Sequence, residues 1–339
     1  MTLVTETDLA HRHGDRPRVI LTRRLLPAVE ARMAELFELV DNPGDVAMTR
    51  EQLAAAMSDC DVLVPTVTDR IDAELIAAAG TRLGLIANFG AGTEHIDIEA
   101  ARARGIVVTN TPSVFTDDTA DLTMALILFV MRRFGVNEQV LRRGEWSGWG
   151  PSSMLGSALS GKRLGIVGMG RIGQAVAHRA RAFGLEVTYH NRRRLPTALE
   201  TMFGARYEAD LDRLITESDI LTLHCPALPG GAALMDARRL AAMKPTACLI
   251  NTGRGQLVDE PALIDALANG HIAGAGLDVF ANEPQINPQL LALPNLVALP
   301  HLGSATHEGR GAAGEKIIAN IRFWVDGHRP PDQVLPQLS

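Results

Sequence analysis

The chain has 339 residues, of which 46% are hydrophobic, 21% charged and 4% aromatic, and its formal net charge at pH 7 is −6. This length and composition exclude a disordered or fibrous chain and are typical of a globular protein with two domains. The negative charge disfavours a nucleic acid as the main partner, because phosphate neutralisation requires a basic face.

The sequence indicates neither a metal site nor a membrane segment. The only cysteines are Cys60, Cys225 and Cys248, and they show no CxxC spacing, which disfavours a disulfide framework and a zinc site. The N-terminal stretch has acidic residues where a secretory signal has positive charge, and it has no apolar core. The longest apolar run, residues 122–131, is about half of a membrane span. We therefore expect a cytoplasmic protein.

From Pro17 onward, short apolar runs alternate with alanine-rich stretches of helical period. Strands are predicted at RVILT, VLVPT and LGLIANFG, and helices at LLPAVEARMAELF and AELIAAAG. This alternation favours a parallel sheet. The segment from Thr116 to Trp146 then has apolar residues at helical spacing until Gly144, which predicts one long connecting helix.

A second α/β series is predicted to begin near Lys162. Its successive strands are KRLGIVGMG, LEVTYHN, DILTLHCP, ACLINTG, IAGAGLDV and LVALPH. A last amphipathic helix, THEGRGAAGEKIIANIRFWVDG, is expected to return to the first domain. The predicted fold class is α/β, with two Rossmann-like domains and the active site in the cleft between them. Residues 17–112 with 304–339 would form a flavodoxin-like substrate domain, and residues 113–303 the dinucleotide-binding domain.

A glycine-rich loop follows the first strand of the second series. Its residues are Gly168, Met169, Gly170, Arg171, Ile172 and Gly173, and a helical pattern and another strand come after it. In a GxGxxG loop, the first glycine permits a tight turn, the second lets the backbone approach a pyrophosphate, and the third allows close helix–strand packing. The helix N-terminus then presents free N–H groups to the phosphates. A purely structural glycine turn is the alternative, but this context favours a dinucleotide.

The residues after the second strand of this series bear on the choice between NAD and NADP. An acidic residue there would bind the ribose 2′-hydroxyl of NAD, but the sequence reads Asn191, Arg192, Arg193 and Arg194. A neutral amide and a guanidinium from Arg192 or Arg193 can bind a 2′-phosphate by charge-assisted hydrogen bonds. The sequence therefore predicts a preference for NADP(H) over NAD(H). The alternative is that the arginines only form a solvated loop.

Several further segments are similar to those of a known family. Together with the glycine loop, the segments INTGRGQLVDEPAL, GLDVFANEP, LPHLGSAT and NFGAGTEHID resemble the D-2-hydroxyacid dehydrogenases. EWSGWGP and NRRR are similar to the glyoxylate/hydroxypyruvate reductase branch. The resemblance implies an enzyme that interconverts 2-oxo acids and D-2-hydroxy acids. It also implies that the family's catalytic arginine, glutamate and histidine correspond to Arg254, Glu283 and His301.

These residue types suit the reduction of a ketone. Hydride adds to the carbonyl carbon while the developing alkoxide needs a proton, which a histidine that titrates near neutrality can supply. His301 would be the general acid in reduction and the base in oxidation. Glu283 would bind the second ring nitrogen, and Arg254 would orient the substrate carboxylate and polarise the ketone. Taken singly, each residue has a structural alternative. Glu283 could be a turn residue, Arg254 could merely follow a strand, and His301 could cap a strand.

The resemblance extends the site to further residues. Ala91 and Gly92 are expected to hold the substrate carboxylate through backbone N–H groups, with Arg254 and His301, unless their stretch is an ordinary glycine turn. Further cofactor contacts are expected at Thr119, Cys225, Pro226, Thr252, Gly253 and Asp278. Asp278 would lie near the nicotinamide carboxamide, or it could be only a structural acid. No metal is required, and His95, His224 and His271 are expected to be surface or packing residues.

The connecting helix and the segment from Trp146 to Leu155 resemble the arm through which the family forms homodimers, so a homodimer is expected. Packing against its own arm is the favoured role for Trp146 and for Trp149, and the alternative is that one of them approaches the partner's substrate pocket.

Other functions compete with this interpretation. A phosphoglycerate dehydrogenase-like enzyme or a 2-ketogluconate reductase would use the same chemistry. A formate dehydrogenase is disfavoured, because its relatives have glutamine where Glu283 stands. A dinucleotide-sensing protein similar to certain transcriptional corepressors would keep the fold without turnover. The residues do not indicate which 2-oxo acid is the substrate.

Overall fold

The computed structural model describes residues 16–335, and the chain forms two compact units. Of the described residues, 16–115 and 306–335 form one unit, and 116–305 form the other. Each unit contains a sheet whose named strands all pair in parallel. The predicted α/β class with two Rossmann-like sheets is therefore confirmed.

The first unit has a five-stranded sheet with the order β2-β1-β3-β4-β5, which is the flavodoxin-like order. Its strands are β1 (Arg18–Leu21), β2 (Glu38–Val40), β3 (Val62–Val64), β4 (Leu85–Ala87) and β5 (Val107–Thr109). Its helices are α2 (Pro27–Leu36), α3 (Arg50–Asp59), α4 (Ala73–Ala78), α5 (Ile98–Ala103) and α14 (His307–Val325).

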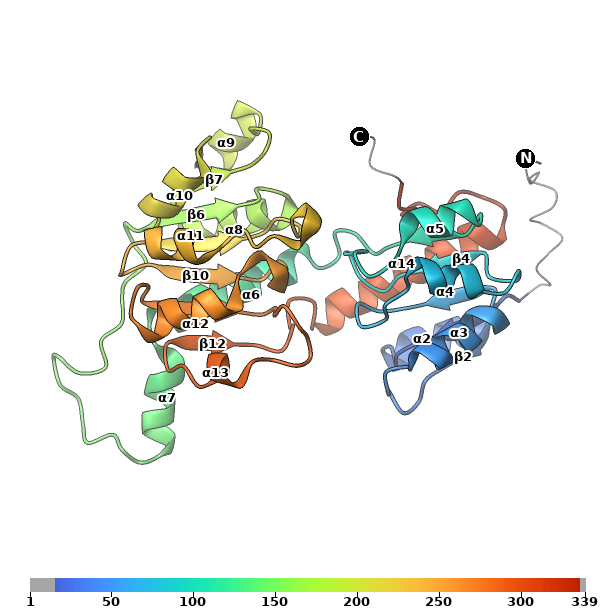
Figure 1. The fold of residues 1–339 in the computed structure, drawn as a ribbon, viewed down its shortest axis with the longest axis horizontal. Coiled ribbons are helices and arrows are strands. Elements are labelled where there is room, and N and C mark those ends of the chain that lie inside the picture. The colour runs from blue at the N-terminus through green and yellow to red at the C-terminus, as the bar shows by residue number, and fades with distance from the viewer. Residues whose placement is uncertain (1–15, 336–339) are drawn as a thin grey trace. The chain divides into compact units, whose positions relative to one another are not determined.

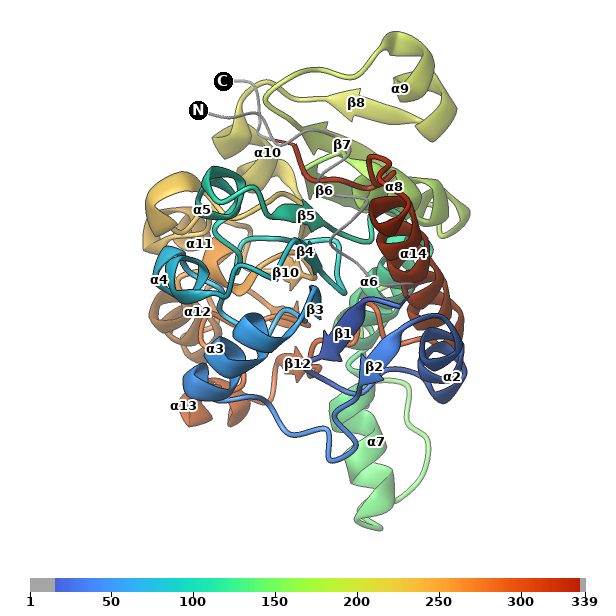
Figure 2. The ribbon, with the colours of Figure 1, turned by 90° about the vertical axis from the view of Figure 1, so that its right-hand side faces the viewer.

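Alternate residues of these strands pack against helices on opposite faces of the sheet. Ile20, Leu63 and Ile86 pack with residues of α3, α4 and α5, whereas the neighbouring strand residues pack with α2 and α14. Figure 2 shows α14 beside α2. The contact requires Gly314, because a Cβ there would lie 2.5 Å from the side-chain carbons of Val29. Both faces are buried, which explains why the strands are continuous apolar runs.

The second unit has a seven-stranded sheet with the order β12-β11-β10-β9-β6-β7-β8, in which the first six strands in sequence have the Rossmann order. Its strands are β6 (Arg163–Val167), β7 (Glu186–His190), β8 (Ala205–Tyr207), β9 (Ile220–Leu223), β10 (Cys248–Asn251), β11 (Gly274–Leu277) and β12 (Leu296–Ala298). Its α-helices are α6 (Thr116–Met131), α7 (Phe134–Arg142), α8 (Arg171–Ala182), α9 (Thr197–Phe203), α10 (Leu211–Glu217), α11 (Ala237–Ala242), α12 (Glu260–Ala268) and α13 (Pro288–Leu291). Two short 3₁₀ helices are η1 (Pro229–Gly231) and η2 (Gly255–Leu257).

The expectation of one continuous connecting helix is wrong. Residues 116–142 form two helices, α6 and α7, and Arg133 between them has a left-handed backbone with φ 54°. The carbonyl of Met131 accepts the N–H of Ser157 at 2.7 Å instead of continuing the helix. Gly156 allows this approach, since a Cβ there would lie 2.7 Å from the Arg132 Cα. Figure 1 shows α7 extending away from the sheet of the second unit.

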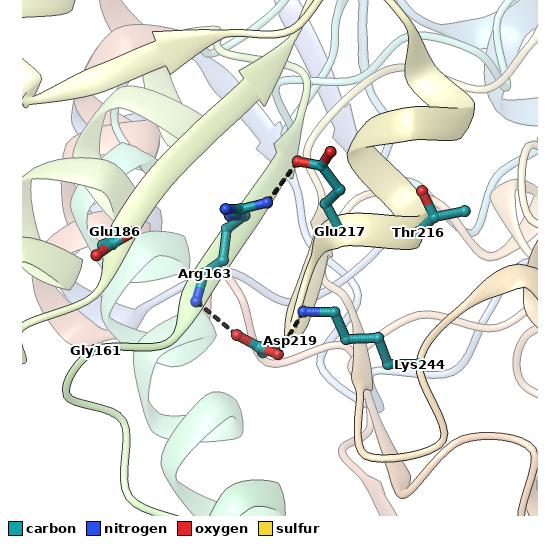
Figure 3. Close-up of a pocket in the computed structure, with 7 residues that line it drawn as sticks. All are labelled: Gly161, Arg163, Glu186, Thr216, Glu217, Asp219 and Lys244. Carbon is teal, nitrogen blue, oxygen red and sulfur yellow. Dashed lines mark hydrogen bonds and ion pairs between the residues drawn. The ribbon is translucent and has the colours of Figure 1, made fainter.

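A small polar pocket lies at the amino edge of the second sheet (Figure 3). Four of the charged groups that line it form two ion pairs. Arg163 pairs with Glu217, and Lys244 Nζ lies 2.8 Å from Asp219 Oδ1. Ligands of open α/β sheets bind at the opposite, carboxyl edge. We therefore place no function in this pocket.

Two further observations concern the described residues 16–335. Their helices include none that is both long enough and apolar enough to cross a membrane. Their histidine, cysteine and carboxylate side chains form no group of three that could hold a metal ion.

Candidate active site

The three predicted catalytic residues lie in the loops that follow three neighbouring strands. Arg254 follows β10, Glu283 follows β11 and His301 follows β12. The carboxyl ends of parallel strands meet at one edge of a sheet, so the fold brings together residues that are 47 positions apart in sequence. The glycine loop, after β6, leaves the sheet at the same edge.

His301 and Glu283 form a hydrogen-bonded pair, with His301 Nδ1 2.7 Å from Glu283 Oε2. The other carboxylate oxygen accepts the backbone N–H of Phe280 at 2.8 Å. The hydrogen bond to Glu283 raises the pKa of His301, although burial opposes the shift. Burial alone would raise the pKa of Glu283, but the bonds from His301 and Phe280 lower it below its usual value. The nearby Arg254 charge lowers both pKa values. The pair therefore favours an imidazolium beside a carboxylate.

The backbone of His301 is held in a left-handed conformation, with φ 56°. Its N–H donates to the carbonyl of Asp278 at 3.0 Å. The buried Asp278 carboxylate accepts the N–H groups of Leu302 at 2.7 Å and Gly303 at 2.8 Å. Thr119 donates its hydroxyl to the carbonyl of Gly303 at 2.9 Å. Asp278 and Thr119, expected as cofactor contacts, thus hold the loop that carries the histidine.

Arg254 is fixed by contacts of its own loop. The buried side chain of Asn251 accepts the N–H of Gly253 at 3.0 Å and donates to the carbonyl of Arg254 at 2.8 Å. Gly255 packs directly on the loop after β11, because a Cβ there would lie 1.9 Å from the carbonyl carbon of Phe280. Sequence reasoning missed the role of Asn251, although its place in the segment INTGRG was a usable signal.

The glycine loop fits a dinucleotide in three respects. A Cβ at Gly168, whose φ is 99°, would lie 2.6 Å from the backbone nitrogen of Cys225, and one at Gly173 would lie 2.3 Å from the carbonyl oxygen of Gly168. A Cβ at Gly170, by contrast, would have no heavy atom within 4 Å. Gly170 is the N-cap of α8, and no side chain caps this helix. The loop is therefore tight against the protein and open where a pyrophosphate would approach a helix N-terminus.

In the loop after β7, some polar side chains bind other residues of the protein and others are exposed to solvent. Asn191 Oδ1 accepts the N–H of Met169 at 2.7 Å and so joins this loop to the glycine loop. Arg194 binds both carboxylate oxygens of Glu200, at 2.9 and 2.8 Å. Arg192 and Arg193 are exposed, and neither has an ion pair within the described part of the chain. Two guanidinium groups of this loop are thus available to a ligand.

The other expected cofactor contacts lie beside these loops. Thr252 is buried, and its hydroxyl lies 2.9 Å from that of Thr123. Gly253 and Cys225 are half-buried, and Pro226 is exposed. Burial raises the pKa of the Cys225 thiol, and the positive charge of nearby Arg192 partly offsets this rise.

The expected carboxylate-binding stretch lies in the first unit, after β4. The carbonyls of Gly90 and Gly92 accept the side-chain N–H groups of Asn88 at 3.1 and 2.8 Å, and that of Ala91 accepts the amide of Asn110 at 2.7 Å. The N–H groups of Ala91 and Gly92 have no hydrogen-bond acceptor among residues 16–335. This stretch therefore has its carbonyls engaged and two donors available.

Comparison with known proteins decides the family. Residues 124–303 match the model of the D-isomer specific 2-hydroxyacid dehydrogenase family, NAD binding domain. The chain belongs to the D-isomer specific 2-hydroxyacid dehydrogenases. The matched range contains the glycine loop, Arg254, Glu283 and His301, and the resemblance inferred from the sequence is confirmed.

Relatives of this dehydrogenase cover nearly its whole length. A glyoxylate reductase of Thermococcus litoralis is 46% identical, and the match covers 94% of this chain and 97% of that protein. A glyoxylate reductase of Aeropyrum pernix is 42% identical, with 94% and 96% covered.

Solved structures of similar enzymes agree with this fold. An NADPH-dependent glyoxylate/hydroxypyruvate reductase from Sinorhizobium meliloti, in complex with NADP and malonate, has a TM-score of 0.83 and 36% identity, with 94% of this chain and 97% of that chain covered. A glyoxylate reductase from Paecilomyes thermophila has a TM-score of 0.84 and 33% identity, with 95% and 99% covered. This dehydrogenase is therefore an oxidoreductase that acts on the CH–OH group of 2-hydroxy acids, or reduces 2-oxo acids, with a nicotinamide dinucleotide.

Proposed function

We propose that this enzyme is a glyoxylate/hydroxypyruvate reductase that uses NADPH, with His301 as its proton donor. The observation that carries the proposal is the His301–Glu283 pair, which stands beside Arg254 at the carboxyl edge of the Rossmann sheet. The choice of substrate is supported by the names of the relatives described above.

His301 would act through Nε2. Its Nδ1 is engaged with Glu283, whereas Nε2 has no hydrogen-bond partner within residues 16–335 and is the nitrogen left to face a substrate. The bound dinucleotide supplies the hydride. The imidazolium gives its Nε2 proton to the ketone oxygen, and Glu283 stabilises the charged ring before the transfer and fixes its orientation. In the oxidative direction the neutral ring takes the proton back.

Arg254, Ala91 and Gly92 would bind the substrate. A guanidinium forms two parallel hydrogen bonds to a carboxylate and can also polarise the neighbouring ketone oxygen. The N–H groups of Ala91 and Gly92 form a short concave run of donors of the kind that binds anions. These residues together would orient a 2-oxo acid for attack at its carbonyl carbon.

The direct test is NADPH oxidation in the presence of glyoxylate, hydroxypyruvate, pyruvate, 2-ketogluconate, phenylpyruvate and 3-phosphohydroxypyruvate, repeated with NADH. Turnover of glyoxylate or hydroxypyruvate supports the proposal. Turnover of only a larger acid would preserve the mechanism and reject the substrate. Binding of the dinucleotide without any turnover would favour a sensing protein instead.

The preference for NADPH is proposed to depend on Arg192 and Arg193. We expect the double variant Arg192→Ala/Arg193→Ala to lose about 10- to 100-fold in kcat/KM with NADPH and little with NADH, because hydrogen bonds to charged groups contribute about 1.5–3 kcal/mol. Steady-state kinetics with both cofactors measures this. Arg194→Lys is the matched control, since Arg194 is committed to Glu200. A wild-type enzyme that favours NADH would contradict the proposal.

We also propose that the chain forms a homodimer through its arm. No residue of α7 is buried. Trp149 is 85% exposed and Trp146 is 52% exposed, so Trp149 does not pack against its own arm and Trp146 does so only in part. Large exposed apolar side chains gather in this region: Phe129, Phe134, Leu141, Trp146, Met154 and Leu155. An apolar patch of this kind marks a protein interface.

Light scattering should give twice the mass of the chain for the wild type, and Leu141→Glu should shift the distribution toward the monomer. Met202→Glu, which places the same charge at another exposed apolar position, should leave the mass unchanged. A monomeric wild type at micromolar concentration would exclude the dimer.

A further inference from the structure

The stretch Asn88–Thr93 is braced by side chains that would not themselves touch a substrate. Asn88 has no exposed surface, and its amide nitrogen donates to the carbonyls of Gly90 and Gly92. Its Oδ1 lies 3.0 Å from Nε2 of His95. From the other side, Asn110 holds the carbonyl of Ala91. Every carbonyl from 90 to 92 is thus bonded to an amide side chain.

These contacts determine the orientation of the Asn88 amide and the state of His95. Two carbonyl acceptors require the nitrogen of the amide to face them, so the oxygen must face His95. Nε2 of His95 must then carry a hydrogen and donate it, because two acceptors cannot bond to each other. His95, expected to be a surface or packing residue, is therefore the donor that completes the hydrogen bonding of a buried amide.

Asn110 is anchored in turn by the C-terminal segment. Its backbone N–H donates to the carbonyl of Asp332 at 3.2 Å. The carboxylate of Asp332 binds Lys316 Nζ at 2.9 Å and the buried Asn320 at 3.2 Å. Both amides that hold the stretch are thus attached to the body of the first unit.

We propose that Asn88, supported by His95, and Asn110 are positioning residues for substrate binding. By holding the carbonyls of residues 90–92 they keep the N–H groups of Ala91 and Gly92 directed toward the substrate carboxylate. This inference rests on the proposed function. Preorganised donors bind an anion without the cost of ordering the backbone, so losing the brace should weaken substrate binding more than it slows chemistry.

The main test is Asn88→Asp, which keeps the size of the side chain. Neither a carboxylate nor a carboxylic acid can donate to two carbonyls. We expect KM for the 2-oxo acid, and the inhibition constant of oxalate, to rise about tenfold, which corresponds to the loss of one or two buried hydrogen bonds. kcat should stay within about twofold and the dissociation constant of NADPH should not change, because the glycine loop lies in the other unit.

Asn42→Asp is the matched control. The Asn42 amide also donates to two carbonyls of the first unit, those of Thr22 at 2.8 Å and Val46 at 2.7 Å, but it braces a different loop. A loss of stability alone would appear in both variants, whereas the rise in KM should appear only in Asn88→Asp.

Two further variants keep the inference testable if Asn88→Asp does not fold. His95→Leu should raise KM and His95→Gln, which restores a donor, should recover most of the loss. Asn110→Ala should also raise KM. Unchanged KM values in a wild-type-like fold would overturn the positioning role and leave the proposed function intact. A wild-type enzyme that reduces none of the 2-oxo acids would overturn both.

Discussion

Replacing His301 with alanine should lower kcat for 2-oxo acid reduction by about 10²- to 10⁴-fold, the usual contribution of a positioned general acid. The ketone oxygen would then have to take its proton from solvent water. The dissociation constant of NADPH, measured by fluorescence titration, should remain that of the wild type. A dinucleotide-sensing protein, by contrast, has no turnover that the His301→Ala substitution could slow.

Two comparisons separate proton transfer from a loss of structure. His271→Ala removes an exposed histidine of the same unit and should leave kcat unchanged. Glu283→Gln removes the charge that raises the pKa of His301. With His301 as the proposed proton donor, reduction would need the protonated ring, so its rate should fall as pH rises through that pKa, and the fall should begin at lower pH in Glu283→Gln. A His301→Ala enzyme with wild-type kcat, or a pH profile unaffected by Glu283→Gln, would reject the assignment.

Replacing Arg254 with alanine should lower kcat/KM for the 2-oxo acid by about 10²- to 10³-fold, as removal of one oxyanion-stabilising donor does in other enzymes. Arg254 is expected to bind the carboxylate in the ground state and the developing alkoxide in the transition state, so KM should rise and kcat should fall together. Arg254→Lys should recover only part of the loss, because an ammonium cannot form two parallel hydrogen bonds. Steady-state kinetics and the affinity for oxalate measure the two contributions.

Arg163→Ala is the control for this prediction. Arg163 lies at the amino edge of the same sheet, where it pairs with Glu217, and its loss should change stability without changing kcat/KM. Equal kinetic losses in both variants would mean that Arg254 acts only on the fold.

The sequence predicted those parts of the structure that local patterns encode. The glycine loop follows a strand and begins a helix, and its three glycines meet the steric demands that their spacing implies. The short strands β2 (ELV) and β8 (ARY) were not predicted, because each contains a charged residue and forms no continuous apolar run, and β5 (VVT) was also missed. The break after α6 depends on Ser157, which lies far along the chain from Met131, so no local pattern marks it.

The candidate site, too, could be predicted from the sequence only in part. The resemblance to the D-2-hydroxyacid dehydrogenases singled out Arg254, Glu283 and His301, and their residue types suit ketone reduction. The bonds of Asp278 to Leu302 and Gly303, and those of Asn88 to its own loop, depend on how loops fold back on themselves. A buried polar residue must be hydrogen-bonded, but the sequence alone does not indicate which groups it binds.

The return of the chain through α14 sets the order in which the molecule can fold during synthesis. The five strands of the first unit all precede residue 110, yet Ile317, Ile321 and Trp324 of α14 complete one of its two apolar layers. The second unit, which contains the residues from 116 to 305, has all of its strands before α14 is made. The second unit can therefore reach its native fold before the first unit is complete. The strands from β1 to β5 are made before the second unit, but one face of their sheet stays partly uncovered until α14 has been made.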